Sequence, residues 1–302
     1  MRSARPLDTM GSLMRACHPG PTIVVTTLAT AYAVALVVGG GFFNGLLRVL
    51  LVMITVLVGQ LSIGWSNDWI DAARDRAAGR RDKPVATGAI SDVVLRNAAF
   101  TALGLAIALS FANGWKAGAM HLLVIGGGWA YNVGLKASIW SWLPYAIAFG
   151  ALPVFVWWSV DPSGTSGQPP WWTWTGTALL GVGAHVANVI PDIDDDLAHG
   201  VRGFPQRIGV GVCGVLAPVL LVAGAAVALL APDRPWSWID TVAAVLVIGL
   251  AFFAGAVSRL PGRARLAFTA TLVIACVVVV ALVVGTATQT GPIYPTTAAV
   301  TS

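Results

Sequence analysis

Long runs of apolar residues, separated by short polar segments, recur along the whole chain. Each run is about 20 residues long, which is the length that a helix needs to cross a bilayer. The pattern predicts nine membrane-spanning helices, over residues 21–41, 45–66, 93–113, 117–133, 139–159, 171–190, 208–231, 238–257 and 265–286. We therefore expect an all-α, polytopic membrane protein with one transmembrane domain over 15–286, a disordered cytoplasmic tail over 1–14 and a disordered C-terminal tail over 287–302.

Composition and charge support this class. The chain is 57% hydrophobic and 10% charged, and it contains no glutamate; an ordinary soluble domain is far less apolar. With the N-terminus inside, 15 of the 18 basic residues fall on the cytoplasmic side, and only Arg48, Lys116 and Arg234 fall outside. This is the positive-inside bias of a multi-pass protein of the cell membrane. Membrane topology thus explains the net positive charge of the chain, without nucleic-acid binding. We therefore expect the lipid bilayer, and no nucleic acid, as a partner.

The first polar cluster directly follows the second apolar run. Asn67, Asp68, Asp71 and Asp75 stand at i, i+1, i+4 and i+8, so in a helix they share one face. Acidic side chains at the end of a membrane span are costly unless they bind something cationic. The spacing therefore predicts a cation site at the cytoplasmic end of this helix.

A second cluster repeats the spacing far downstream. Asn188, Asp192 and Asp196 stand at i, i+4 and i+8, whereas Asp194 is turned about 200° from Asp192. Pro191 is expected to kink or end the helix here. Since both clusters end spans on the same cytoplasmic side, we expect two similar halves that face each other across a shared cavity.

Basic side chains follow each acidic cluster. Arg80, Arg81 and Lys83 come after the first cluster, and Arg202 and Arg207 come after the second. Either these cations simply pair with the carboxylates, or they complete a site for a polyanion held by both metal and base. The density of both signs within about 20 residues favours the polyanion.

Three further residues have two interpretations each. Lys136 either anchors the topology between two spans or contacts the anion, and Tyr131 either packs at the interface or hydrogen-bonds the anion. His185 lies three residues before Asn188, so it either lines the site or packs between helices. The residues alone leave all three open.

Aspartates without a cysteine or histidine pattern are hard oxygen ligands. They suit Mg²⁺, which is commonly held by one or two carboxylates together with substrate phosphates. Two such clusters with nearby arginine and lysine describe a diphosphate site, and the apolar bundle would hold a long hydrocarbon. The implied chemistry is ionisation of an allylic diphosphate and attack of an acceptor on the allylic carbon.

The motifs resemble those of the UbiA superfamily of intramembrane prenyltransferases, which have nine helices and two Asp-rich motifs. Resemblance runs from about Arg15 to the ninth span. The matching positions are N-D-x-x-D-x-x-x-D at Asn67, Asp68, Asp71 and Asp75, a basic-Pro-x-x-x-Gly element at Lys83, Pro84 and Gly88, Tyr131 with Lys136, and D-x-x-x-D-x-x-x-G at Asp192, Asp196 and Gly200, with a later glycine at Gly209.

The resemblance implies a role for each site residue. Asp68, Asp71 and Asp75 would bind one Mg²⁺, with Asn67 orienting the cluster, and Asp192 and Asp196 would bind a second, with Asn188 in support. Among these, Asp68, Asp71, Asp192 and Asp196 are the expected catalytic residues. The diphosphate of the prenyl substrate would be bound by Arg80, Lys83, Lys136 and Arg202, with Tyr131 donating a hydrogen bond.

Three departures from the family pattern concern the substrate. Ala137 stands where many relatives have arginine, Gly203 stands where relatives usually have threonine or serine, and no extra basic residue is dedicated to an aromatic carboxylate. The acceptor therefore stays open among aromatic, quinone-precursor and lipid compounds.

Other functions remain to be weighed. A terpene cyclase on the same fold would use the same residues, and the sequence does not separate it from a transferase. A cation-coupled transporter is disfavoured, because its site would lie near the midplane of the bilayer. A CDP-alcohol phosphotransferase is disfavoured because its D-G-x-x-A-R motif is absent, Asp71 being followed by Ala72.

Overall fold

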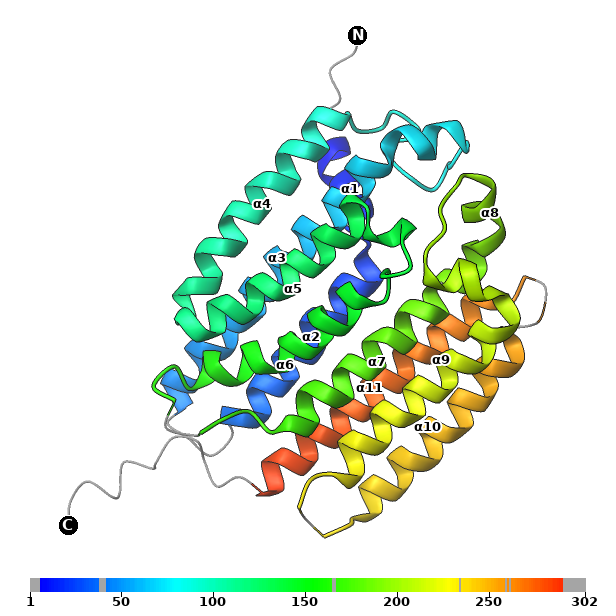
Figure 1. Ribbon diagram of the computed structural model, residues 1–302. Coiled ribbons are helices and arrows are strands. Elements are labelled where there is room, and N and C mark those ends of the chain that lie inside the picture. Colours follow the sequence, from blue (N-terminus) through cyan, green and yellow to red (C-terminus); the bar gives the residue numbers. More distant parts are fainter. Residues whose placement is uncertain are drawn as a thin grey trace, which may run out of the picture.

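The computed structural model describes residues 6–37, 42–164, 167–233, 235–258, 260 and 262–289. Within these ranges, nine long helices coincide with the nine predicted spans (Figure 1). They are α2 (Pro19–Val37), α3 (Phe42–Ala77), α4 (Asp92–Ala112), α5 (Trp115–Val133), α6 (Leu143–Val160), α7 (Trp171–Val189), α9 (Phe204–Leu230), α10 (Trp238–Val257) and α11 (Ala264–Gln289). The shorter elements are α1 (Pro6–Ala16), η1 (Leu135–Ala137), η2 (Ile190–Asp192) and α8 (Ile193–Ala198).

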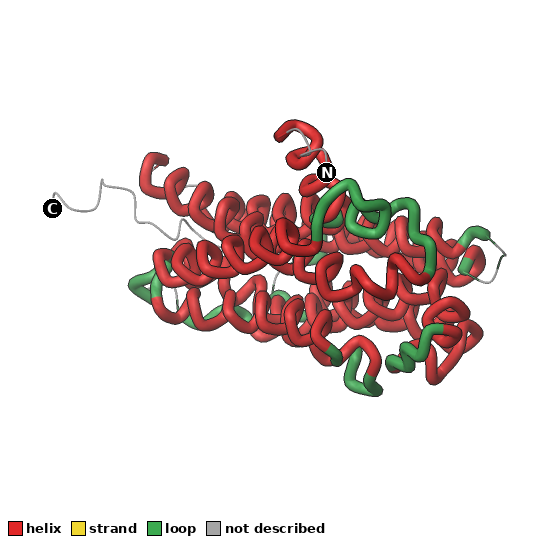
Figure 2. The backbone as a smooth tube through the Cα atoms, turned by 90° about the horizontal axis from the view of Figure 1, so that it is seen from above, coloured by secondary structure: helices red, strands yellow, loops and turns green. Residues whose placement is uncertain are grey.

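The fold class is confirmed as all-α. Figure 2 shows helices joined by loops, and the described residues contain no strand. Six helices (α2, α3, α4, α6, α9 and α10) are long and apolar enough, by length and composition, to cross a membrane. The described part of α11 adds a shorter apolar stretch over Leu266–Ala281.

Local sequence explains where several helices begin. Ser91 caps α4 by accepting a hydrogen bond from the Val94 amide at 3.3 Å. Ser237 and Asp240 form a reciprocal capping box at the start of α10. Pro144 and Pro205 stand in the first turns of α6 and α9, where the missing proline N–H costs no helical hydrogen bond.

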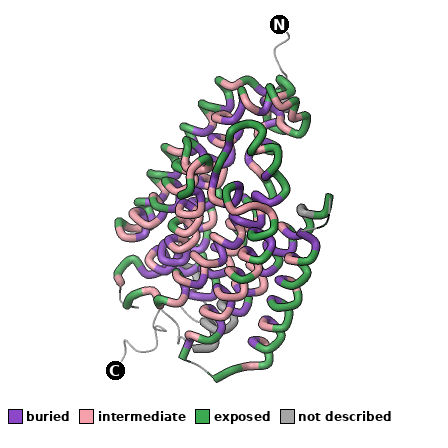
Figure 3. Tube along the Cα trace, turned by 45° about the vertical axis from the view of Figure 1, so that its right-hand side comes forward, coloured by how far each residue is buried: buried purple, intermediate pink, exposed green. Residues whose placement is uncertain are grey.

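The long helices lie side by side, with α4 at one edge of the bundle and α10 at the other (Figure 1). One apolar core joins α2, α3 and α6 through Leu36, Val52 and Phe155, and another joins α7, α9 and α11 through Leu221 and Ile274. Buried positions concentrate between the helices, whereas exposed positions lie on the outer faces and in the loops (Figure 3).

The N-terminal segment differs from the expectation of a disordered tail over 1–14. Residues 6–16 form the helix α1, because its apolar side packs on α3 and α4. Leu13 and Ala16 contact a cluster that contains Ala72 and Leu95, and the indole N–H of Trp65 donates to the Leu13 carbonyl at 2.9 Å. Residues 1–5 lie outside the described part of the chain.

Two other boundaries bear on the site. The helix of the second predicted span, α3, continues to Ala77, well past the predicted end at 66. The first acidic cluster therefore lies within α3 itself. The predicted C-terminal tail over 287–302 overlaps the last turn of α11, and residues 290–302 lie outside the described residues.

Candidate functional site

A cavity of about 510 Å³ opens at the end of the bundle where α3 and α7 finish. Carboxylates from both acidic clusters line it: Asp71 and Asp75 from α3, and Asp192, Asp195 and Asp196 from the η2–α8 segment. The prediction that two clusters distant in sequence share one cavity is therefore met by the geometry.

Asp68 lies behind the cavity wall and does not line it. Its side chain is 1% exposed, and Oδ1 accepts a hydrogen bond from Lys83 Nζ at 2.6 Å. The same oxygen lies 2.9 Å from Nε2 of His18. The second oxygen, Oδ2, is buried and has no hydrogen-bond partner. A buried carboxylate needs pairing to stay charged, so Lys83 and His18 stabilise its ionised form.

Asp71 is paired with two cations, one at each oxygen. Lys136 Nζ contacts Oδ1, and Arg74 Nη2 donates to Oδ2 at 2.9 Å. Lys136 comes from η1, 65 residues further along the chain. Its position at Asp71 favours a role in the site over a purely topological one. Burial lowers the pKa of the Lys136 ammonium, and Asp71 opposes this shift.

Asn67 belongs to a hydrogen-bond chain that ties α3 to α5. Its side-chain amide donates to Asn132 Oδ1 at 3.0 Å. The amide of Asn132 in turn donates to the Ile63 carbonyl at 3.0 Å and to Ser66 Oγ at 2.9 Å. Because Asn132 is buried and fully engaged, it fixes α5 beside the acidic face of α3.

The second cluster does not lie on one continuous helix. Pro191 falls just after the end of α7, as predicted, and the chain passes through η2 before α8 begins. Asn188, Asp192 and Asp196 nevertheless line the same cavity, whereas Asp194 does not. Gln206 donates to Asp196 Oδ2 at 2.7 Å. Burial raises the pKa of the Asp196 carboxyl, and the hydrogen bond from Gln206 opposes that shift.

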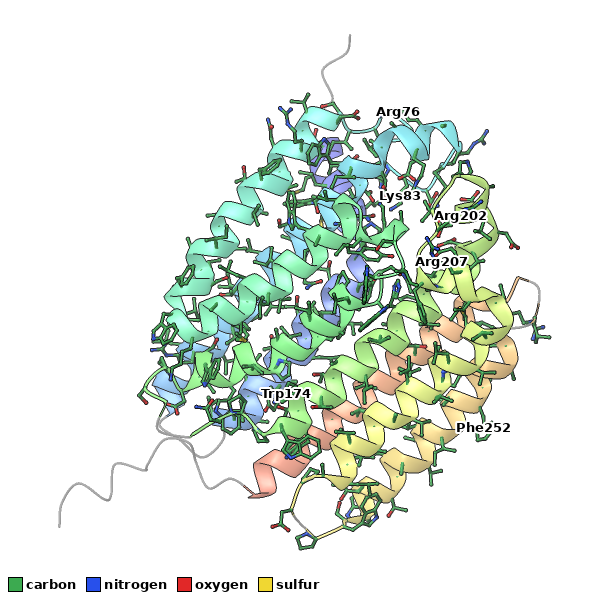
Figure 4. The ribbon with its side chains drawn as sticks, in the orientation of Figure 1. Arg76, Lys83, Trp174, Arg202, Arg207 and Phe252 are labelled. Carbon is green, nitrogen blue, oxygen red and sulfur yellow. The ribbon has the colours of Figure 1, made fainter. Side chains whose placement is uncertain are left out.

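The loop after α3 supplies the remaining cations of the cavity. Arg80 lines it and makes a bidentate pair with Asp82, at 3.0 Å from Nε and 2.9 Å from Nη2. This pairing lowers the pKa of Asp82 to about 2. Arg202 is exposed and does not line the cavity, so its contact with the diphosphate stays a prediction. Figure 4 shows Lys83 and Arg202 at the same end of the bundle, on loops that follow α3 and α8.

Gly203 has a steric reason to lack a side chain. A Cβ atom there would lie 2.4 Å from the Lys136 carbonyl oxygen and 2.7 Å from Gln206 Oε1. The backbone at 203 therefore packs directly against η1, which presents Lys136 to Asp71. The departure from the threonine or serine of relatives is explained by this close approach.

An aromatic wall stands beside the acidic groups. Tyr131 and Tyr145 line the cavity with edge-to-face rings whose centroids are 5.2 Å apart. His185 lies behind them, 1% exposed, and its Nε2 is 3.1 Å from Ser141 Oγ. Because His185 is not part of the lining, its packing interpretation is favoured.

A second cavity, of about 170 Å³, continues from the first between α2, α6, α7 and α11. The two share Pro21, Val25, Tyr145, Phe149, Leu152 and Asn188 in their walls. Its other lining is mainly aliphatic and aromatic, including residues Leu28, Val156, Leu180, Phe268 and Leu272. The site as a whole therefore has a charged end and an apolar end.

The donor set fits a hard divalent cation. Asp68 Oδ2 and Asp75 Oδ2 are buried carboxylate oxygens without hydrogen-bond partners, and such oxygens are stabilised by a cation. Among the described residues, no three histidine, cysteine, aspartate or glutamate side chains gather closely enough to hold a metal ion by themselves. A cation here would thus complete its shell with phosphate oxygens and water, as Mg²⁺ commonly does.

A bundle of long apolar helices with two acidic clusters around one cavity is the architecture expected of a membrane-embedded prenyltransferase. The model of the UbiA prenyltransferase family matches residues 26–263, and the chain belongs to this family. It is accordingly a multi-pass membrane enzyme. No curated protein gives a significant sequence match to the chain.

Solved structures share the fold across nearly their whole length. A UbiA homologue from Aeropyrum pernix K1 superposes with a TM-score of 0.68 at 19% identity, covering 86% of this chain and 97% of that one. A UbiA homologue from Archaeoglobus fulgidus, bound to GPP and Mg²⁺, gives 0.66 at 17% identity, with 91% and 99% covered. A digeranylgeranylglyceryl phosphate synthase gives 0.66 at 16% identity, with 93% and 99% covered.

The sequence pattern did not indicate four polar residues of the site: His18, Arg74, Asn132 and Gln206. Arg74 was within reach of sequence reasoning, since it stands three residues after Asp71 on the same helical face. Asn132 and Gln206 depend on tertiary packing, and His18 is 50 residues away from the carboxylate it contacts. Local spacing carries no signal for such pairs.

Proposed function

We propose that this protein transfers a prenyl group from an isoprenoid diphosphate to a hydrophobic acceptor within the membrane, in a reaction that depends on Mg²⁺. The observation that supports this most is the continuity of the two cavities. Carboxylates and cations suited to a metal diphosphate line one end, and an apolar space suited to a hydrocarbon continues from it.

The carboxylates would hold the metal ions. Asp68, Asp71 and Asp75 would hold one Mg²⁺, and Asp192 and Asp196 a second, with Asn67 and Asn188 in support. Bound Mg²⁺ would offset the negative charge that develops on the diphosphate as it departs.

The present ion pairs suggest how the diphosphate is bound. Lys83 and Lys136 now neutralise Asp68 and Asp71. With cations on these carboxylates, both ammonium groups would be available to the phosphate oxygens, so no buried charge would be left unpaired. Arg80 would add a guanidinium from the loop after α3. Arg202, which is exposed and outside the cavity lining, would add another from the loop after α8.

The reaction then follows from this placement. The bond between the allylic carbon and the diphosphate oxygen breaks, the allylic carbon bonds to the acceptor, and the acceptor loses a proton. Tyr131 and Tyr145 wall the cavity next to the acidic groups. Their ring faces favour a nearby carbocation.

The acceptor class would be aromatic, quinone-precursor or lipid. A test is to incubate the purified protein with prenyl diphosphates of several lengths, with and without an extract of membrane lipids, and to measure diphosphate release and product mass. The proposal expects diphosphate release that needs the extract, and a product whose mass is that of an acceptor with one hydrogen replaced by the prenyl group. The variant Asp192→Asn serves as the inactive control.

Two other outcomes contradict this proposal. Hydrocarbon formed from the prenyl diphosphate alone would identify a terpene cyclase on the same fold. Binding of the diphosphate without any turnover, across all chain lengths and with extract present, would leave the transfer activity without support.

A further inference from the structure

The corner between α1 and α2 places a histidine over the first acidic cluster. His18 has a backbone φ of 54°, in the left-handed region that side chains other than glycine seldom adopt. Thr22 supports this conformation with two hydrogen bonds, from its amide to the His18 carbonyl at 3.2 Å and from Oγ1 to the Cys17 carbonyl at 2.8 Å. An uncommon backbone conformation persists where its surroundings hold it in place.

Glycine in α3 lets this corner approach very closely. A Cβ at Gly64 would lie 2.5 Å from the Cys17 carbonyl oxygen and 2.9 Å from its Cα. Gly64 stands one helical turn before Asp68, on the same face of α3. The corner is therefore pressed against α3 at the level of the carboxylate, and the hydrogen bond from Trp65 to Leu13 holds α1 in the same place.

The imidazole reaches the most buried carboxylate of the site. His18 Nε2 lies 2.9 Å from Asp68 Oδ1 and 3.1 Å from Lys83 Nζ. A protonated Nε2 donates to Asp68, whereas a bare Nε2 accepts from Lys83, so each tautomer keeps one hydrogen bond. Lys83 shares the same carboxylate oxygen, which makes the two groups alternative donors to Asp68.

We infer that His18 is a positioning residue for Asp68. With Lys83 on a diphosphate, Nε2–H of His18 would hold Oδ1 in place and leave Oδ2, which has no hydrogen-bond partner, available to a cation. This inference rests on the proposed function. It also makes the segment before residue 26, which lies outside the part matched by the family model, a component of the site.

The test uses a substitution that suits the backbone. In His18→Gly the left-handed conformation is unstrained, because glycine adopts it freely, while the imidazole is lost. His18→Gln keeps an N–H donor at the place of Nε2. The side chain is 39% exposed and lines the cavity, so free imidazole can enter the space that His18→Gly leaves.

The measurement is the affinity of a non-hydrolysable prenyl thiodiphosphate as a function of Mg²⁺ concentration, with thermal unfolding of the ligand-free protein as the folding control. We expect His18→Gly to need about 10- to 100-fold more Mg²⁺, as when partners of metal ligands are removed. Unfolding temperature should be unchanged or higher. Millimolar imidazole should restore most of the loss in His18→Gly and do nothing to the wild type, and His18→Gln should resemble the wild type.

Two results would overturn the inference. The first is an unchanged Mg²⁺ requirement in His18→Gly. The second is a raised Mg²⁺ requirement that imidazole does not correct in His18→Gly and that His18→Gln shares, which would show that the α1–α2 corner has only a structural role. A wild-type protein whose diphosphate binding ignores Mg²⁺ would instead contradict the proposed function itself. The two failures are therefore distinguishable.

Discussion

Asp68 and Asp71 are each neutralised by a lysine from another segment, Lys83 and Lys136. Charge spacing alone places Lys83 beside the first acidic cluster, and only the family resemblance also brings Lys136 to the site. The sequence does not predict which lysine pairs with which aspartate, because the pairing depends on how the loop after α3 and the η1 segment fold back. Nor does it predict that Arg202 is exposed and outside the cavity lining.

Two carboxylates of the second acidic run, Asp192 and Asp194, separate a site role from a general charge effect. Asp192→Asn should lower the rate by about 100-fold or more, since about 3 kcal/mol of charge stabilisation is lost when a metal ligand is neutralised. Asp194→Asn should change the rate less than about threefold, because Asp194 is exposed and outside the cavity lining. Steady-state assays of both variants, with equal amounts of folded protein, provide the comparison. Equal losses in the two variants would show that the cavity does not select between these carboxylates.

Among the elements, the segment from α7 to α9 shows most clearly what sequence pattern can and cannot predict. The apolar run over 171–190 predicts α7. Pro191 predicts where the helix ends, because proline cannot continue the helical hydrogen bonds. The pattern predicts that Asp192 and Asp196 face the shared cavity, but it does not predict the break into η2 and α8 that places them there, nor that α9 starts four residues earlier than expected. Those features depend on Gln206 and Gly203, which contact the site only once α9 has packed against η1.

The break inside α9 yields a prediction at this scale. Gly209 has φ 78° and ψ 165°, a conformation accessible essentially to glycine alone. Gly209→Ala should therefore destabilise the protein by about 1–3 kcal/mol. The matched control is Gly211→Ala, two residues on, where a Cβ would meet nothing within 4 Å. The control should leave stability unchanged or raise it by about 1 kcal/mol. Thermal unfolding in one detergent would measure both, and the account of the break would be wrong if Gly209→Ala were as stable as the control.

In the whole molecule, the loop after α3 and the helix α8 lie at one end of the bundle, and the connection between α6 and α7, which contains Gln168, lies at the other (Figure 1). The number and placement of the long helices could be predicted because each apolar run has membrane length. The joining of the two cavities could not be predicted, since it depends on which helices become neighbours. For example, α2 packs against α6 and also against α11, which is far from it in the sequence.

The orientation of this bundle remains a prediction from the positive-inside bias. In a background with Cys17, Cys213 and Cys276 replaced by alanine, the exposed positions Arg81→Cys and Gln168→Cys report on the two ends. Membrane-impermeant maleimide added to intact cells should label Gln168→Cys alone, and Arg81→Cys should react only after the cells are opened. Labelling of both positions from the same side would contradict the topology.

The central claim is that the aspartates of the cavity hold a metal ion together with a diphosphate. In the part of the chain that the structure describes, no three carboxylates gather tightly enough to bind a cation alone, so Mg²⁺ should bind weakly to the free protein. Prenyl diphosphate should then tighten Mg²⁺ binding, and Mg²⁺ should tighten diphosphate binding by the same factor, because such coupling is reciprocal. The direct measurement is a titration of a prenyl thiodiphosphate into the purified protein, first with EDTA and then with millimolar Mg²⁺. We predict binding at least about tenfold tighter with Mg²⁺, corresponding to about 1.4 kcal/mol of coupling, and no such gain in Asp71→Asn. Equal affinity under both conditions would mean that these aspartates are not metal ligands.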